Sequence, residues 1–63
     1  MSQRHTGRMT DHLVRSRLRS GGAIPRWRLV RYIDSEEIYA VLGVDHSESV
    51  SQARERLAQM EKE

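Results

Sequence analysis

The chain has 63 residues and no cysteine, so we expect one small domain without a disulfide framework or a thiolate metal site. No apolar run approaches the roughly 20 residues that span a bilayer, and none forms the apolar core of a secretion signal. We therefore predict a cytoplasmic protein that makes no membrane contact.

The charged residues are divided unevenly between the two halves of the chain. Residues 1–32 contain eight arginines and one aspartate, a net charge of +7, whereas residues 33–63 contain three basic and eight acidic groups, a net charge of −5. Arginine makes bidentate hydrogen bonds to phosphates and to guanine edges. A basic half of this composition is typical of proteins that bind a polyanion.

The first 20 residues contain two kinds of pattern. Residues 1–10 are polar and basic without periodicity, which predicts a flexible basic arm. Along residues 11–20, Arg15, Arg17 and Arg19 alternate with apolar or small side chains, and this period of two favours a β-strand. A helix capped by Thr10 is the alternative, but its leucines are poorly spaced for one apolar stripe.

Two further strands are expected after a turn at residues 21–25, which contains two glycines and a proline. Residues 26–34 and 38–44 are rich in aromatic and β-branched side chains, which suit a pleated surface. In the first of these segments Trp27, Leu29 and Ile33 share one face. The opposite face carries Arg26, Arg28 and Tyr32.

The last segment changes to a helical period. Val50, Ala53, Leu57 and Met60 recur at the spacing of one apolar helix stripe, after a loop rich in capping residues. We therefore predict an α+β fold, a three-stranded antiparallel sheet with one C-terminal helix packed on one face. The arm would occupy residues 1–10 and a single βββα domain residues 11–63.

Residues 39–58 also have the appearance of a DNA-binding helix-turn-helix centred on Gly43. In the common pattern a buried residue lies six positions after the turn glycine, where this chain has Ser49 and places Val50 one position later. A small residue is expected four positions before the glycine, where this chain has Tyr39. We therefore favour strand, loop and helix for this stretch over a helix-turn-helix regulator.

With the strands assigned, residues 27–58 resemble the arm-type DNA-binding domain at the N-terminus of phage integrases, which are tyrosine recombinases. The matching residues are Trp27, Arg31, Tyr32, Asp34, Leu42, Gly43, Ser49, Val50, Ala53, Arg54 and Glu55. The chain departs from that family in the turn at residues 35–37, which lacks the common glycine, and it contains no recombinase catalytic domain. The resemblance implies a three-stranded sheet laid in the major groove during phage DNA recombination, with the helix behind it.

These observations predict a small double-stranded DNA-binding module whose sheet face and arginine-rich arm contact DNA. The predicted nucleic-acid-binding residues are Arg4, Arg8, Arg15, Arg17, Arg19, Arg26, Arg28 and Tyr32. The acidic C-terminal helix is left to meet a protein partner. We expect no catalysis and no cofactor, because no nucleophile is paired with a base and no glycine-rich phosphate loop is present.

Three alternative functions remain open, and we expect no metal site. A phage- or plasmid-type protein-interaction or inhibitor module and an arginine-rich RNA-binding protein fit the same composition, and the helix-turn-helix regulator is the third alternative. His5, His12 and His46 are scattered along the chain, so we predict no metal site and expect histidines in solvated loops.

Overall fold

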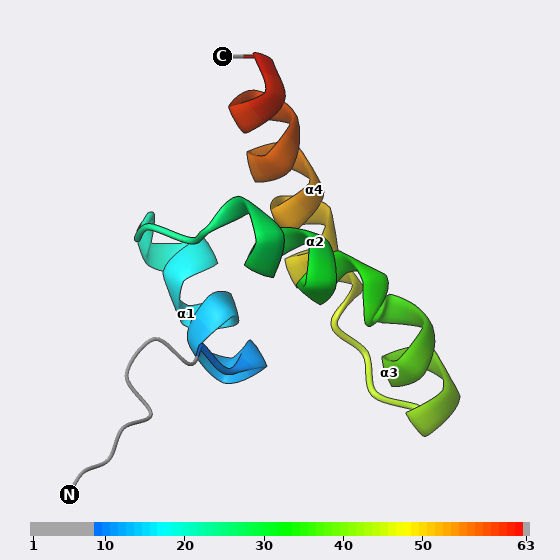
Figure 1. Cartoon of the computed structure of the whole chain (residues 1–63). Helices are drawn as coiled ribbons and strands as arrows, with labels where there is room; N and C mark the ends of the chain where they lie inside the picture. Colours follow the sequence, from blue (N-terminus) through cyan, green and yellow to red (C-terminus); the bar gives the residue numbers. More distant parts are fainter. Residues whose placement is uncertain (1–8, 63) are drawn as a thin grey trace, which may run out of the picture.

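The computed structural model describes residues 9–62, and every regular element in this part of the chain is a helix. Figure 1 shows them in order: α1 (Asp11–Ser20), α2 (Arg26–Asp34), α3 (Glu36–Leu42) and α4 (Ser47–Lys62). The predicted α+β fold is wrong, because the described residues contain no strand. The greater part of the predicted basic arm, including Arg4 and Arg8, lies outside the described residues.

Helix α1 replaces the first predicted strand because both of its ends carry strong local signals. The Thr10 hydroxyl accepts a hydrogen bond from the backbone N–H of Leu13 at 3.2 Å, which is an N-cap. At the other end Gly21 adopts a φ of +84° and donates to the carbonyl of Arg17. The apolar stripe is formed by buried Val14 and partly buried Leu18, four residues apart, so the period of two reflects only the spacing of the arginines.

Helix α2 replaces the second predicted strand and supplies the centre of the core. Pro25 precedes the helix with a φ of −62°, which suits the start of a helix. Leu29 and Tyr32 are buried and Ile33 is partly buried, a helical spacing of three and four residues. Trp27, expected to share a face with Leu29 and Ile33, is instead exposed. Strand propensity reflects packing context, and here the surrounding helices decide.

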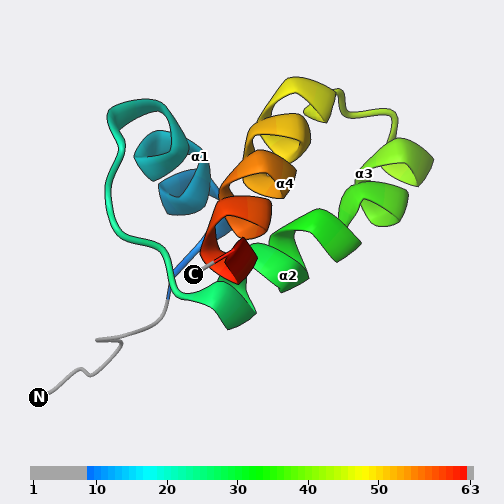
Figure 2. The ribbon, with the colours of Figure 1, turned by 90° about the horizontal axis from the view of Figure 1, so that it is seen from above.

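Helix α3 follows α2 almost without a break and replaces the third predicted strand. It has seven residues, none of them buried, and ends at Gly43 with a φ of +78°. Figure 2 shows α3 at the edge of the molecule, on the side away from α1. The stretch from Glu36 to Lys62 is helix, turn and helix, so the preference for strand, loop and helix in residues 39–58 is wrong. Helices α3 and α4 do not pack on each other as a pair. Helix α3 lies mainly against α2.

Helix α4 confirms the one helix that the sequence predicts. Val50 and Ala53 are buried, and Leu57 and Met60 pack against the core from the same stripe. The helix lies on α2 and α1 (Figure 2). The buried apolar core consists of Val14, Ile24, Leu29, Tyr32, Val50 and Ala53. No helix within residues 9–62 has the length and apolarity needed to cross a membrane.

Candidate anion site between α1 and α4

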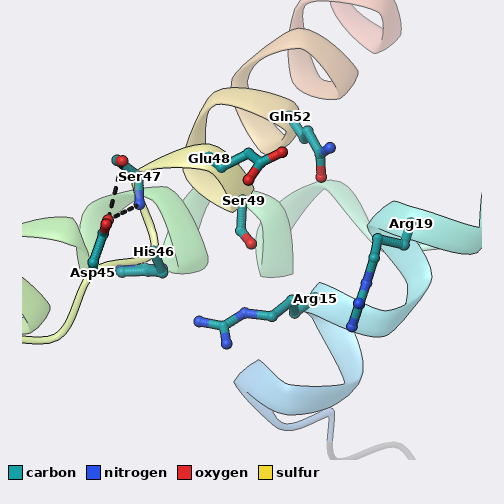
Figure 3. A pocket seen from close by; sticks show the side chains of 8 residues that line it. All are labelled: Arg15, Arg19, Asp45, His46, Ser47, Glu48, Ser49 and Gln52. Atoms are coloured by element: carbon teal, nitrogen blue, oxygen red, sulfur yellow. Dashed lines mark hydrogen bonds between the residues drawn. The ribbon is translucent and has the colours of Figure 1, made fainter.

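A cleft of about 490 Å³ separates α1 from the first turns of α4. Figure 3 shows two arginines of α1 on one side and the polar side chains of the α4 N-terminal segment on the other. The lining residues are Arg15, Arg19, Asp45, His46, Ser47, Glu48, Ser49 and Gln52. We call this feature the α1–α4 cleft.

Arg15 and Arg19 reach the cleft together because they lie four residues apart on α1. Residues with this spacing lie one above the other on the same face of a helix. Neither arginine forms an ion pair with another described residue. The Nε of Arg15 is buried and has no hydrogen-bond partner in the described part of the chain. One unsatisfied cationic donor therefore lies in the wall of the cleft.

The opposite wall is the N-terminus of the 16-residue helix α4. The Asp45 carboxylate accepts hydrogen bonds from the backbone N–H and the hydroxyl of Ser47, each at 3.1 Å. These bonds hold the pKa of Asp45 below its usual value of 3.8. The next N–H groups, of Glu48 and Ser49, have no carbonyl one turn back within the helix. The helix dipole adds positive potential here, which favours a bound anion.

His46 lines the cleft beside Asp45, just before α4. It is only 6% exposed, so the expectation of a solvated loop histidine is wrong. Its Nδ1 lies 3.2 Å from the Tyr32 hydroxyl, and its ring meets the edges of Tyr32 and Tyr39. Its Nε2 is buried without a partner among the described residues. His46 therefore joins the segment before α4 to Tyr32 of α2 and Tyr39 of α3.

Two carboxylates also line the cleft and oppose an anion. Asp45 is engaged by Ser47, as described above. Glu48 extends along α4, and no ion pair joins it to Arg15 or Arg19. The arginines therefore stay available despite their acidic neighbours. The arrangement can bind one small oxyanion through guanidinium and backbone N–H donors, against partial repulsion from Glu48.

The structure distributes the residues predicted for DNA contact over several surroundings. Arg15 and Arg19 come together in the α1–α4 cleft. The Arg17 guanidinium donates to the carbonyl of Ala23 at 2.8 Å. Tyr32 is 1% exposed and lies in the core, so in this fold it is not available to a DNA groove.

The two predicted arginines of α2 are engaged in contacts between helices. Arg26 forms an ion pair with Glu61 of α4 at 2.9 Å. Arg28 pairs with Asp11 and donates to the carbonyl of Met9. The continuous cationic face expected from a sheet is therefore absent from the described residues, because helical geometry turns alternate arginines in different directions.

Sequence reasoning missed His46 and the α4 N-terminus as parts of the site. The spacing of Arg15 and Arg19 is a usable signal, because it repeats the four-residue spacing of Val14 and Leu18 on α1. Nothing in the sequence around His46 distinguishes it from the other two histidines. In the described part of the chain, no three His, Cys, Asp or Glu residues gather closely enough to hold a metal ion.

No protein-family model, curated protein or solved structure matches this chain. The three-stranded sheet implied by the resemblance to phage integrases is contradicted by the helical fold. The α1–α4 cleft and the charge of the chain are therefore the features that bear on its function.

Proposed function

We propose that the chain is a small double-stranded DNA-binding module whose α1–α4 cleft takes a backbone phosphate. The observation that carries the proposal is the pairing of Arg15 and Arg19 on one wall with the α4 N-terminus on the other. Guanidinium groups and helix N-termini are both donors that proteins use to bind phosphate. The cleft combines both within one site.

Two buried nitrogens without partners among residues 9–62 support an oxyanion as the ligand. The Nε of Arg15 is a donor, and the Nε2 of His46 becomes one in the tautomer that carries its proton there. A phosphate has several acceptor oxygens and satisfies more than one donor at once. Both residues line the α1–α4 cleft, where a phosphate would lie next to them.

The charge distribution supports a polyanion over an isolated phosphate ion. Residues 1–32 have a net charge of +7, and both cleft arginines belong to this half. Phosphate contacts position a protein on nucleic acid, and most non-specific affinity comes from them. Helix α1 also exposes His12 and Ser16 beside the cleft arginines, and the major groove of B-form DNA admits an α-helix. The deep, narrow major groove of A-form RNA does not.

The test is a fluorescence-anisotropy titration of a labelled duplex with the chain at several salt concentrations. The double variant R15Q/R19Q should bind on the order of tenfold or more weakly, because glutamine amides are uncharged and lose the guanidinium attraction to phosphate. The slope of log K against log salt should fall by about 0.9 for each phosphate that the variant no longer neutralises. R31Q is the charge-matched control for the single variant R19Q, because Arg31 is exposed on α2 outside the cleft and forms no ion pair within residues 9–62.

Two results would overturn the proposal. Equal weakening by R19Q and R31Q means that affinity follows net charge and not the cleft. Stronger competition by structured RNA than by unlabelled duplex DNA means that RNA is the partner. Arg19 is exposed, so the single variant R19Q keeps the test valid if the half-buried Arg15 is needed for folding. Circular dichroism checks the helix content of each variant.

A further inference from the structure

Helix α3 turns an apolar stripe toward solvent. Ile38, Val41 and Leu42 are 61%, 85% and 66% exposed and have the spacing of one helix face. Val44, just beyond Gly43, is also exposed. We call Ile38, Val41, Leu42 and Val44 the α3 apolar stripe. Scattered exposed apolar residues are ordinary on protein surfaces, whereas a contiguous group marks an interaction site.

The orientation of the stripe is set by polar contacts on the other sides of α3. The Tyr39 hydroxyl donates to Asp11, and its ring lies 4.0 Å from the ring of His46. Glu36 pairs with Arg54 of α4 at 2.5 Å. These contacts fix α3 on the body of the molecule by its polar and aromatic side chains. The apolar side chains are therefore presented outward on an anchored helix.

The segment that carries the stripe is strongly acidic. Residues 34–42 contain three carboxylates and no lysine or arginine, namely Asp34, Glu36 and Glu37. Arg31 of α2 borders the stripe at Ile38, where both line a shallow hollow with Asp34. An apolar surface framed by acids complements an apolar surface framed by bases.

We propose that the α3 apolar stripe docks a cationic amphipathic helix of a partner protein. Helices of this kind bind by their apolar face, while their charged flanks set orientation and partner choice. A second copy packed symmetrically through the same stripe would bring the Asp34, Glu36 and Glu37 carboxylates of both copies together, which disfavours that occupant. DNA and anionic lipid are repelled for the same reason. The stripe is therefore a second surface, independent of the α1–α4 cleft.

Two synthetic helical peptides of roughly 15 residues test the proposal, one built from Leu and Lys and one from Leu and Glu. Both have the same apolar positions, and binding to the whole chain is followed by anisotropy of a peptide label. We expect the Leu/Lys peptide to bind and the Leu/Glu peptide not to bind. Binding of the Leu/Lys peptide should weaken as salt rises, because exposed charges are screened.

Variants of the chain assign the binding to the stripe. I38S/V41S should weaken binding of the Leu/Lys peptide at least tenfold and should keep the fold, because neither side chain is buried. W27S is the matched control, since Trp27 is an exposed apolar residue of α2 outside the stripe, and its binding should be unchanged. R15Q/R19Q should also bind this peptide normally, which separates the stripe from DNA binding. Circular dichroism verifies that each variant is folded.

Three outcomes would overturn the inference. If the two peptides bind equally, charge complementarity plays no part in the binding. If I38S/V41S binds the Leu/Lys peptide as the wild type does, the peptide binds outside the stripe. The third is self-association: sedimentation velocity of the wild-type chain should show a monomer across the concentrations used. A dimer that I38S/V41S dissociates means that a second copy covers the stripe.

Discussion

The imidazole of His46 meets the phenol of Tyr32 inside the core, with Nδ1 3.2 Å from the hydroxyl oxygen. The rings are 5.3 Å apart in an edge-to-face arrangement. The contact joins the segment before α4 to α2. It also gives the Tyr32 hydroxyl a partner, while the rest of this side chain packs in the apolar core. One nitrogen of His46 is satisfied in this way, and the other, Nε2, has no partner among residues 9–62.

Removing this hydroxyl should therefore destabilise the fold. We expect Tyr32→Phe to lower the free energy of unfolding by about 1–3 kcal/mol, because a buried histidine nitrogen loses its partner. Ser51→Ala deletes an exposed hydroxyl on α4 and should change stability by no more than about 0.5 kcal/mol. Urea denaturation followed by circular dichroism measures both. Equal losses in the two variants would show that the tyrosine–histidine contact contributes nothing specific.

Two leucines give a matched test of the core and of the α3 apolar stripe. Leu29 is fully buried between the helices, whereas Leu42 is mostly exposed on α3. Leu29→Ala should lower the free energy of unfolding by about 2–5 kcal/mol, because it removes buried methyl groups and leaves a cavity. Leu42→Ala should change the free energy of unfolding by no more than about 0.5 kcal/mol. Thermal unfolding of the two variants measures the difference, and comparable costs would mean that α3 is packed into the core in solution.

Glu48 should limit the affinity of the cleft for DNA. Its carboxylate lines the α1–α4 cleft and forms no ion pair with the arginines across it. Two unit charges 4 Å apart in water interact by about 1 kcal/mol, so Glu48→Gln should tighten duplex binding by about fivefold. Glu37→Gln removes the same charge from α3, outside the cleft, and should have little effect. Weaker binding by the Glu48 variant would place the phosphate elsewhere.

The sequence predicts an element correctly where its apolar residues follow a single periodicity. Val50, Ala53, Leu57 and Met60 predict α4 correctly, because a stripe of this length fits no strand. In residues 11–20 the arginine alternation obscures the stronger cap signals at Thr10 and Gly21. In α2 the aromatic and β-branched residues suggest a strand, although they also allow a helical spacing of the buried side chains. Short segments of this composition take the conformation that their packing partners impose.

The candidate site is only partly accessible to the same reasoning. The sequence predicts Arg15 and Arg19 as binding residues, but on a sheet face that also includes Tyr32, which the fold buries. Their meeting with the α4 N-terminus depends on how α1 packs against α4, and no local pattern contains that information. The burial of His46 likewise follows from its contacts with two tyrosines on α2 and α3.

The Asp45 carboxylate should make stability depend on pH at the start of α4. Hydrogen bonds from Ser47 lower the pKa of Asp45 below 3.8 in the folded chain. A carboxyl with a lowered pKa binds its proton more readily when unfolded, so its contribution is fully present well above pH 3.8. That contribution is lost as the pH falls through the folded value.

We therefore expect Asp45→Ala to be less stable than the wild type at pH 7 and to approach it at low pH. Urea denaturation at several pH values between about 2 and 7 measures the two free energies of unfolding. Asp45→Asn is the control, because its amide oxygen still accepts from Ser47 but does not titrate. The stability of this variant should exceed that of Asp45→Ala by a margin that varies little with pH. A gap between wild type and Asp45→Ala that persists at full size at the lowest pH would show that Asp45 acts without its charge.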